Sequence, residues 1–253
     1  MDARGHLHVL RALTRTEFRL RDQGTLLGFT WTLLHPLLLF LVLHTIFARM
    51  TGSGIDRFGA YLLIGIAFWN FFSSATAGAI QIFPRRAALI RNSNVSRTVL
   101  VLSGVLTYFL SHLLELSVLL PLLLLLGCVP GVHVLFLPVV LLLELLLVLG
   151  VSFLLSTAAV YFRDVERIWS ILSLALFLMT PVFYAYRDIP GAQRVWVQAN
   201  PVTHIVAFAR GALLHHEVPG LRHLALFTAA VLALLAVSWA LFRRQQGGFA
   251  ERV

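Results

Sequence analysis

The chain of 253 residues contains no lysine, one cysteine and few charged side chains. All 20 basic residues are arginine, which we interpret as a bias in genome composition. With Cys128 alone, the chain cannot form an internal disulfide or a cysteine-based metal cluster. Charged residues make up 12% of the chain, against about 25% in an average soluble domain. Because 59% of the residues are hydrophobic and the mean hydropathy is +0.87, the composition predicts a membrane protein.

Motifs of nucleotide hydrolysis and of common hydrolases are also missing. A phosphate-binding loop of the type GxxxxGK[ST] requires a lysine, and neither GxSxG nor HExxH occurs. We therefore expect no cofactor in this chain and no enzyme activity of its own. The net charge of +9 is compatible with nucleic acid, but the arginines lie between apolar runs and form no basic patch. We expect no nucleic-acid partner.

The N-terminal segment Leu7–Arg21 has an amphipathic pattern and no apolar core typical of a cleaved signal peptide. At 100° per residue its arginines share one side of a helix and its apolar residues cover the other. This pattern favours a helix in the headgroup layer, with its arginines toward anionic lipid. An ordinary cytoplasmic helix with a solvated face is the alternative.

Six apolar segments follow, each near the roughly 20 residues that span a bilayer. They are Trp31–Ala48, Phe58–Phe83, Thr98–Gly127, Leu135–Val160, Ile168–Tyr186 and Leu221–Phe242. We predict a single all-α membrane domain over residues 1–253, without internal repeats. It comprises a cytoplasmic helical region (1–30), helices one to five (31–186), an outer segment (187–220) and helix six (221–243).

Arginines are distributed unevenly between the two sides of this arrangement. With both termini inside, fourteen of the twenty arginines lie in inner segments and six in outer ones. The positive-inside rule therefore predicts cytoplasmic termini. The inner loop Pro84–Arg97 is short and basic. It is either a simple topogenic loop or a docking element for a cytoplasmic partner.

Residues 187–220 are too apolar for an ordinary solvated loop. Asn200 followed by Pro201 is typical of a helix start, with asparagine as N-cap and proline in the first turn. We predict short helices over Ala192–Ala199 and Pro201–Leu214, neither long enough to span. Irregular backbone at membrane depth is tolerated where protein or a water-filled cavity covers it. The two helices either re-enter the outer leaflet or lie on the outer surface.

Glu115 and Glu144 lie inside apolar segments, where ionisable residues are costly and usually face the interior of a bundle. We expect them at similar depth on consecutive helices, with His112 one turn from Glu115. They form either a proton relay or substrate contact, or a buried polar clamp. The sequence His215-His216-Glu217 resembles a metal cluster, but adjacent residues do not share a helix face, so an exposed loop is the simpler interpretation.

Several motifs, in this order, resemble the membrane subunit of ABC-2 type exporters, in the branch that exports polysaccharides such as O-antigen and teichoic acid. They are Arg19-Leu20-Arg21-Asp22, Gly24-Thr25-Leu26-Leu27-Gly28, Trp31-Thr32-Leu33-Leu34-His35-Pro36, Tyr161-Phe162-Arg163-Asp164-Val165, Thr180-Pro181-Val182-Phe183-Tyr184 and Asn200-Pro201. The resemblance covers most of the chain. It implies the ABC-2 permease fold in an inner-membrane homodimer with two copies of a separate ATPase, which binds ATP and Mg.

The resemblance also implies sites. ATPase coupling would involve Arg85, Arg86, Ala88, Leu89, Arg91 and Asn92. A cytoplasmic gate would include Arg11, Arg15, Arg19, Arg21 and Asp22. A channel would be lined by Phe68, Trp69, Phe71, Phe72, Phe177, Phe183 and Tyr184, although such aromatic residues also anchor helices at the lipid interface. The outer gate would include Tyr186, Trp196, Asn200, Pro201 and Arg210.

The resulting hypothesis is a permease that moves lipid-linked polysaccharide across the inner membrane. A related exporter of drugs, lipids or other small molecules is the nearest alternative. An acyl- or glycosyltransferase using Glu115, Glu144 and His112, or a scaffold without transport, are alternatives of other classes. The sequence does not distinguish one glycan from another.

Overall fold

The computed structural model describes residues 3–20, 30–51, 55–87, 90, 95–129 and 131–249, and within these ranges it is helical without a β-strand. The long helices are α1 (Ala3–Leu20), α2 (Thr30–Thr51), α3 (Phe58–Ile80), α6 (Arg97–Leu125), α7 (Leu137–Tyr161), α8 (Val165–Met179) and α11 (Leu221–Gln245). The shorter elements are α4 (Ile82–Arg85), α9 (Gly191–Ala199), α10 (Pro201–Arg210), the 3-10 turns η1 (Val132–Phe136), η2 (Tyr186–Asp188) and η4 (Gln246–Gly248), and the π-helical turn η3 (Gly211–His215). The prediction of an all-α chain is confirmed.

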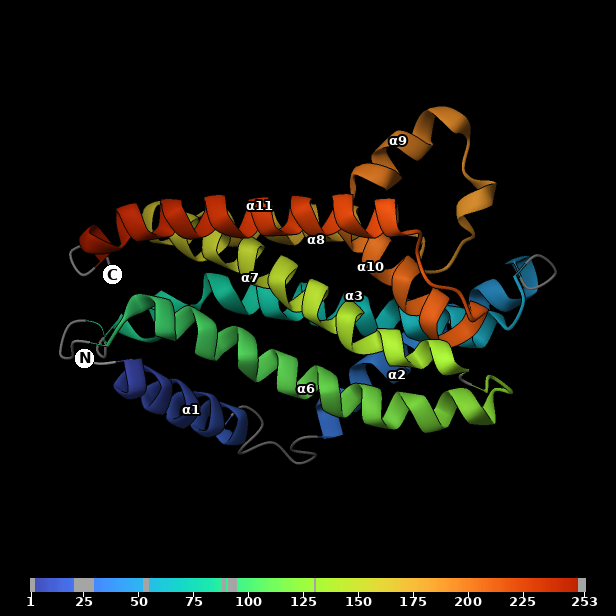
Figure 1. The fold of residues 1–253 in the computed structure, drawn as a ribbon, viewed down its shortest axis with the longest axis horizontal. Coiled ribbons are helices and arrows are strands. Elements are labelled where there is room, and N and C mark those ends of the chain that lie inside the picture. Colours follow the sequence, from blue (N-terminus) through green and yellow to red (C-terminus); the bar gives the residue numbers. More distant parts are fainter. Residues whose placement is uncertain are drawn as a thin grey trace.

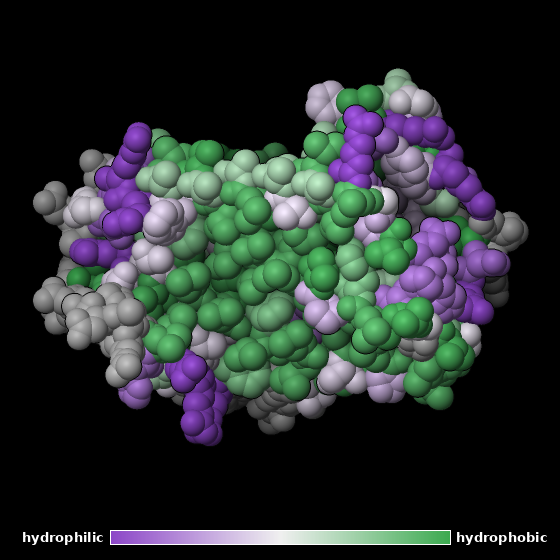
Figure 2. All heavy atoms as spheres, in the orientation of Figure 1, coloured by the Kyte–Doolittle hydropathy of each residue, from purple (hydrophilic) through white to green (hydrophobic). Residues whose placement is uncertain are grey.

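The long helices lie lengthwise in the molecule (Figure 1). Among the described residues, four helices are long and apolar enough to cross a membrane: α3, α6, α7 with its leading turn η1, and α11 with its trailing turn η4. In the space-filling view, an apolar band covers the middle of the molecule and hydrophilic side chains gather toward both ends (Figure 2). This distribution matches a bundle that spans a hydrocarbon layer.

The remaining two predicted spans correspond to α2 and α8. Helix α2 contains the whole of the predicted segment Trp31–Ala48, and among its described side chains the apolar stretch is Leu33–Phe47. The predicted fifth segment was to end at Tyr186, but α8 ends at Met179, because the chain turns out of the helix at Thr180. Its 15 residues extend about 22 Å, less than the roughly 30 Å of a hydrocarbon core. By length and composition, therefore, four helices qualify as spans.

The start of α1 and the end of α11 lie at the same end of the molecule, at the left of Figure 1. We call this the inner end, and the opposite end the outer end. The links from α3 to α6 and from α7 to α8 are also at the inner end, whereas α9 protrudes at the outer end. The chain thus returns to the side on which it begins.

Helix α3 is the centre of the bundle. It is apolar on all sides, which is typical of a buried helix. It packs against α2, α6, α7, α8 and α10. Two glycines permit close approach, because a Cβ at Gly65 would meet the guanidinium of Arg210 and one at Gly78 would meet the ring of Tyr108.

A second apolar cluster closes the inner end. The rings of Phe83, Phe242 and Phe249 are fully buried and pack with centroids 5.0 to 6.1 Å apart, with Phe249 edge-on to the other two. The cluster joins α4, the end of α11 and the C-terminal segment after η4. Helix α1 packs beside it on α6.

Candidate functional site

The irregular segment after α8 leaves backbone carbonyls without helical partners, and its neighbours supply donors for them. The hydroxyl of Tyr184 donates to the carbonyls of Leu178 and Met179, at 3.0 and 2.9 Å. The hydroxyl of Tyr61, on α3, donates to the carbonyls of Pro181 and Tyr184, at 3.2 and 2.9 Å. This meets the requirement that non-helical backbone within a membrane protein be covered by protein.

Arg210 makes the most extensive set of these bonds. Its Nε and Nη2 donate to the carbonyl of Tyr61 at 3.1 and 2.8 Å. Its Nη1 and Nη2 donate to the carbonyls of Pro181 and Val182 at 2.6 and 3.0 Å. The guanidinium carbon lies 3.3 Å from the centroid of the Tyr61 ring, in a cation–π arrangement. Only 4% of the surface of Arg210 is exposed. The arginine distribution assigns Arg210 to the outer side, but its side chain is buried and links α3, the irregular segment and α10.

Asn200 fastens the other end of α10. Its Oδ1 accepts from the backbone N–H of Val202 at 3.1 Å, which confirms the predicted N-cap. Its Nδ2 donates to Thr180 Oγ1 at 2.8 Å and to the carbonyl of Leu176 at 3.3 Å. We call the set Tyr61, Thr180, Asn200 and Arg210, with the carbonyls they bind, the outer clamp.

The two short outer helices are confirmed as helices, but they lie in different surroundings. The apolar face of α10 is buried against α3 and α7, through Val202, Ile205, Val206, Ala209 and, in η3, Leu213. In α9 only Val197 is buried, and Trp196 is 68% exposed. Of the predicted outer gate, Asn200, Pro201 and Arg210 therefore belong to α10 and the outer clamp, whereas Tyr186 and Trp196 lie on the protruding side.

An outer cavity of about 610 Å³ lies between the end of α8 and α9. It is mostly apolar, and its rim includes the aromatic side chains of Tyr184 and Trp196 with the polar groups of Asp188 and Gln193. Tyr186 stands beside it and accepts a 2.6 Å hydrogen bond from Gln198. Aromatic faces next to a few polar groups suit a sugar ring as well as a lipid tail.

A pair of histidines joins α10 to α11. Nε2 of His204 donates to the carbonyl of Gln198 at 2.8 Å, so its Nδ1 accepts from Nε2 of His223 at 3.0 Å. Burial of His204, and to a lesser degree the nearby His223, hold the pKa of His204 below its ordinary value of 6.5. Protonation of His204 removes the acceptor and breaks the contact.

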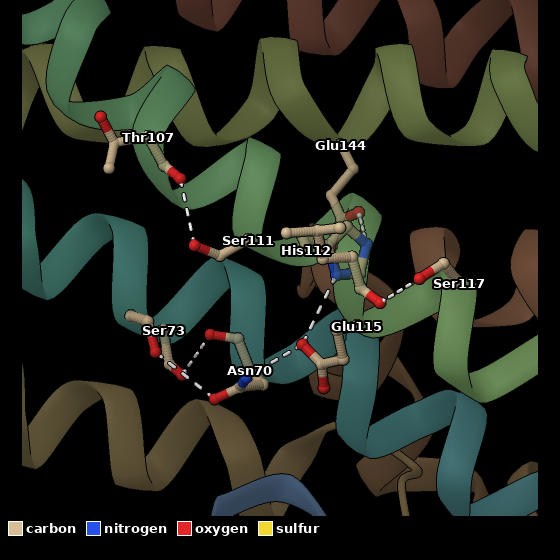
Figure 3. A network of polar contacts seen from close by, with 10 residues as sticks. Asn70, Ser73, Thr107, Ser111, His112, Glu115, Ser117 and Glu144 are labelled. Carbon is tan, nitrogen blue, oxygen red and sulfur yellow. Dashed lines mark hydrogen bonds and ion pairs between the residues drawn. The ribbon is translucent and has the colours of Figure 1, made fainter. Parts of the chain in front are cut away.

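The two intramembrane carboxylates meet at His112, as Figure 3 shows. Nε2 of His112 lies 3.4 Å from Glu144 Oε2, and Nδ1 lies 3.9 Å from Glu115 Oε2. Asn70 Nδ2 donates to Glu115 Oε2 at 3.1 Å. We call these four residues the histidine network. Several of its buried atoms, including both histidine nitrogens, have no hydrogen-bond partner of good geometry among the described residues.

The aromatic residues predicted to line a channel divide into two groups. Phe68 and Phe71 are buried and pack on the His112 ring, with centroids 5.2 and 5.0 Å away. Four of the others, Phe72, Trp69, Phe177 and Phe183, form a row of rings with two residues that were not predicted, Trp169 of α8 at one end and Phe47 of α2 at the other. Successive centroids in the order Trp169, Phe72, Trp69, Phe177, Phe183 and Phe47 are 4.8 to 6.2 Å apart. Tyr184 adjoins Phe183. Phe177, Phe183 and Tyr184 are partly exposed, whereas Trp69 and Phe72 are buried in the single chain.

At the inner end, α1 carries Arg11, Arg15 and Arg19 on its exposed side, as its amphipathic pattern predicts. Arg85 is exposed, but Arg86 forms an ion pair with Glu17 of α1 and donates to the carbonyl of Leu100 at 3.1 Å. The other predicted gate and coupling residues lie outside the described part of the chain: Arg21, Asp22, Ala88, Leu89, Arg91 and Asn92.

Sequence reasoning did not assign Tyr61 or Glu17 to a site. Glu17 interrupts the apolar side of an amphipathic helix, which is a signal for a buried ion pair. Tyr61 offers no such signal, since its partners are far away in the chain. His215, His216 and Glu217 are exposed, and no group of three potential metal ligands gathers among the residues that the structure describes.

The family model for the ABC-2 type transporter matches residues 8–214, from α1 through the outer clamp to η3. This chain belongs to the ABC-2 type transporter family. The similarity to characterised proteins extends over nearly the whole length. The "O-antigen export system permease protein RfbA" of Myxococcus xanthus is 29% identical over 247 residues, which cover 97% of this chain and 95% of that protein. A protein of the same name from Klebsiella pneumoniae is 26% identical over 249 residues, covering 96% and 94%.

Membership of the family identifies the chain as a permease subunit, with several apolar helices, and explains why it lacks a phosphate-binding loop. The matched residues include every element that carries the outer clamp and the histidine network. The resemblance drawn from the sequence motifs is thus confirmed at the level of the family.

Proposed function

We propose that this chain is the transmembrane subunit of an exporter that moves a lipid-linked polysaccharide, of the O-antigen or teichoic-acid type, across the inner membrane. The observation that carries the proposal is the match to O-antigen export permeases over at least 96% of the chain and 94% of each relative.

The aromatic row and the outer cavity support a path for sugars. Aromatic rings stack on the apolar faces of sugars and tolerate sliding, because the contact lacks fixed hydrogen bonds. Phe177, Phe183 and Tyr184 are partly exposed members of this path, and it leads toward the cavity beside Trp196. Two copies of the chain would line the path from both sides in an assembly of six crossings each, with α8 as the short crossing.

ATP hydrolysis on a separate ATPase would drive the movement. The exposed Arg85 would meet that partner from the inner end, with Arg91 of the same loop as a further contact, while Arg86 would transmit the movement through Glu17 to α1. The outer clamp would hold the exit closed until the inner end moves. Both termini would be cytoplasmic, in agreement with the arginine distribution.

The test is the fate of surface glycan in cells that lack the chain. We expect the surface polysaccharide to be lost while lipid-linked polymer accumulates inside, detected with a glycan-specific antibody before and after permeabilisation. Plasmid-borne wild type should restore export. An unchanged surface glycan, together with new sensitivity to drugs, would instead support the alternative of a small-molecule exporter.

Coupling is tested separately with Arg85→Glu and Arg91→Glu. ATPase stimulation by the reconstituted permease should fall, with the permease still folded, because both charges would repel the surface that accepts them. Arg163→Glu, an exposed arginine of the other inner turn, serves as the control. Undiminished stimulation would contradict the docking assignment.

A further inference from the structure

The ion pair between Glu17 of α1 and Arg86, which directly follows α4, lies at the wall of an open cavity of about 350 Å³. The cavity is lined by Glu17, Gly78, Gln81, Ile82, Arg85, Arg86, Gly104, Thr107 and Tyr108. The amide nitrogen of Gln81 already donates to Glu166 at 2.6 Å. The cavity therefore offers an anionic ligand two guanidinium groups and the hydroxyl of Thr107.

The groups around the Glu17 carboxylate resemble those of an anion-binding site. Arg86 faces its carboxylate with Nη2 while Nη1 is oriented by the carbonyl of Leu100. The hydroxyls of Ser103 and Thr107, on α6, lie beside the same carboxylate. Both now donate to carbonyls of their own helix, at 3.0 and 2.8 Å, and a hydroxyl can rotate to donate elsewhere.

Burial of the Glu17 carboxylate disfavours its charged form. Burial raises the pKa of Glu17 above its ordinary value of 4.5, although Arg86 and the hydroxyls act in the opposite direction. A ligand with more negative charge and three acceptor oxygens would use the same donors better. Phosphate has both properties, and arginine binds it in the bidentate geometry that it uses for carboxylate.

We propose that Arg86, Ser103 and Thr107 form a binding site for a phosphate group, that Arg85 adds a second charge, and that Glu17 occupies the site in this structure. A phosphate that enters the cavity displaces Glu17 and thereby detaches α1 from α6. Since α1 is amphipathic, the headgroup of an anionic lipid is one source of the phosphate. Free inorganic phosphate or pyrophosphate is the other. The site does not depend on which substrate the chain exports.

The experiment measures binding to the full chain in nanodiscs of zwitterionic lipid. Dioctanoyl phosphatidic acid and inorganic pyrophosphate are titrated separately by calorimetry at constant ionic strength. Glu17→Gln, which removes the competing charge, should bind about fivefold more tightly than wild type, since an exposed to half-buried ion pair is worth about 1 kcal/mol. Arg86→Gln should lose saturable binding, and Arg222→Gln, at the exposed start of α11, should bind as wild type does.

The outcomes separate the two sources and the null result. Binding of phosphatidic acid alone assigns the site to a lipid headgroup, and binding of both ligands assigns it to the phosphate group itself. Absence of saturable binding overturns the proposal, as does Glu17→Gln that binds no more tightly than wild type. If Arg86→Gln fails to fold, hydrogen exchange of α1 in the wild-type chain tests the proposal instead. The exchange of α1 must rise with ligand concentration, because the ligand is proposed to detach α1 from α6.

Discussion

The outer clamp and the histidine network both place charged groups inside an apolar bundle, but they satisfy them differently. Among the described residues Arg210 has no acidic partner, and it donates four hydrogen bonds of 2.6 to 3.1 Å to three carbonyls. His112 lies between two carboxylates, yet at 3.4 and 3.9 Å. Every donor of the Arg210 guanidinium group that faces the clamp is hydrogen-bonded, whereas in the network only Asn70 makes a short hydrogen bond and His112 relies on charge across longer gaps.

This difference indicates two kinds of polar site in one bundle. Groups that are fully hydrogen-bonded fix a unique backbone arrangement, and removing one member leaves buried carbonyls without donors. Groups that are held by charge alone can be replaced together by neutral residues of similar size without loss of stability. We therefore expect the outer clamp to be indispensable for the fold and the histidine network to be replaceable as a unit.

The largest effect should come from Arg210→Met. Methionine fills the space but supplies no donor to the carbonyls of Tyr61, Pro181 and Val182, so we expect a loss of about 3 kcal/mol or more. Thermal unfolding followed by size-exclusion chromatography measures it. Arg222→Met, at the exposed start of α11, is the control and should unfold as wild type does. Equal stability of the two variants would contradict the clamp.

His112→Leu leaves Glu115 and Glu144 without their shared counter-charge. We expect a smaller effect of about 2 kcal/mol, below the roughly 3 to 5 kcal/mol for removing one partner of a well-formed buried ion pair, because the contacts are long. The loss is smaller than at Arg210 since the contacts that it removes are longer. The same thermal assay applies. Ser117→Ala, on the exposed side of α6, is the matched control. A loss as large as that of Arg210→Met would show that the two sites do not differ.

Tyr61→Phe tests one side of the clamp. The change removes the hydrogen bonds to the carbonyls of Pro181 and Tyr184 but keeps the ring under Arg210, so we expect a loss of about 1 to 2 kcal/mol. Chemical or thermal unfolding in detergent measures it. A wild-type midpoint for Tyr61→Phe would mean that water or another group replaces the hydroxyl.

Acidification should loosen the contact between α10 and α11. Because the pKa of His204 is lower in the folded chain than its ordinary 6.5, the stabilising contact is present above 6.5 and is lost as the pH falls toward the folded pKa. The protection of the amides in the first turns of α11, measured as hydrogen exchange corrected for its intrinsic dependence on pH, should therefore fall below pH 6.5. His204→Phe should abolish this loss of protection. Protection that is independent of pH in wild type would refute the assignment.

The smallest effect is expected on the protruding helix. Trp196→Ala should change stability by no more than about 0.5 kcal/mol, because most of the side chain is exposed. If the outer cavity carries sugars, the same variant should nevertheless reduce surface glycan at equal membrane abundance, as shown by antibody labelling. Normal export by Trp196→Ala would remove the cavity from the path.

Local rules explain which parts of the fold the sequence predicts. The start of α10 follows from Asn200 and Pro201, and its buried face follows from helical periodicity, because both depend on residues close in the chain. The predicted end of the fifth segment was wrong, because the apolar run continues past Thr180 although the helical backbone ends there. Four of the spans agree with their apolar runs for the same reason: length and composition are local.

Long-range contacts explain what the sequence does not predict. Arg210 and Tyr61 are 149 residues apart, and a charge count assigns Arg210 to the outer solvent. The position of Arg86 depends on Glu17, which lies on a different helix. The similar depth of Glu115 and Glu144 was predicted from helix lengths, but the role of His112 as their link required the packing of α6 on α7.

The most direct test of the contrast between the two sites is the stability of a variant that neutralises the whole histidine network: His112→Leu, Glu115→Gln and Glu144→Leu together. Gln keeps an acceptor for Asn70, and the other two changes replace charge with apolar volume. We predict a thermal unfolding midpoint equal to or above that of wild type, and above that of His112→Leu alone. A midpoint as low as that of Arg210→Met would contradict the account.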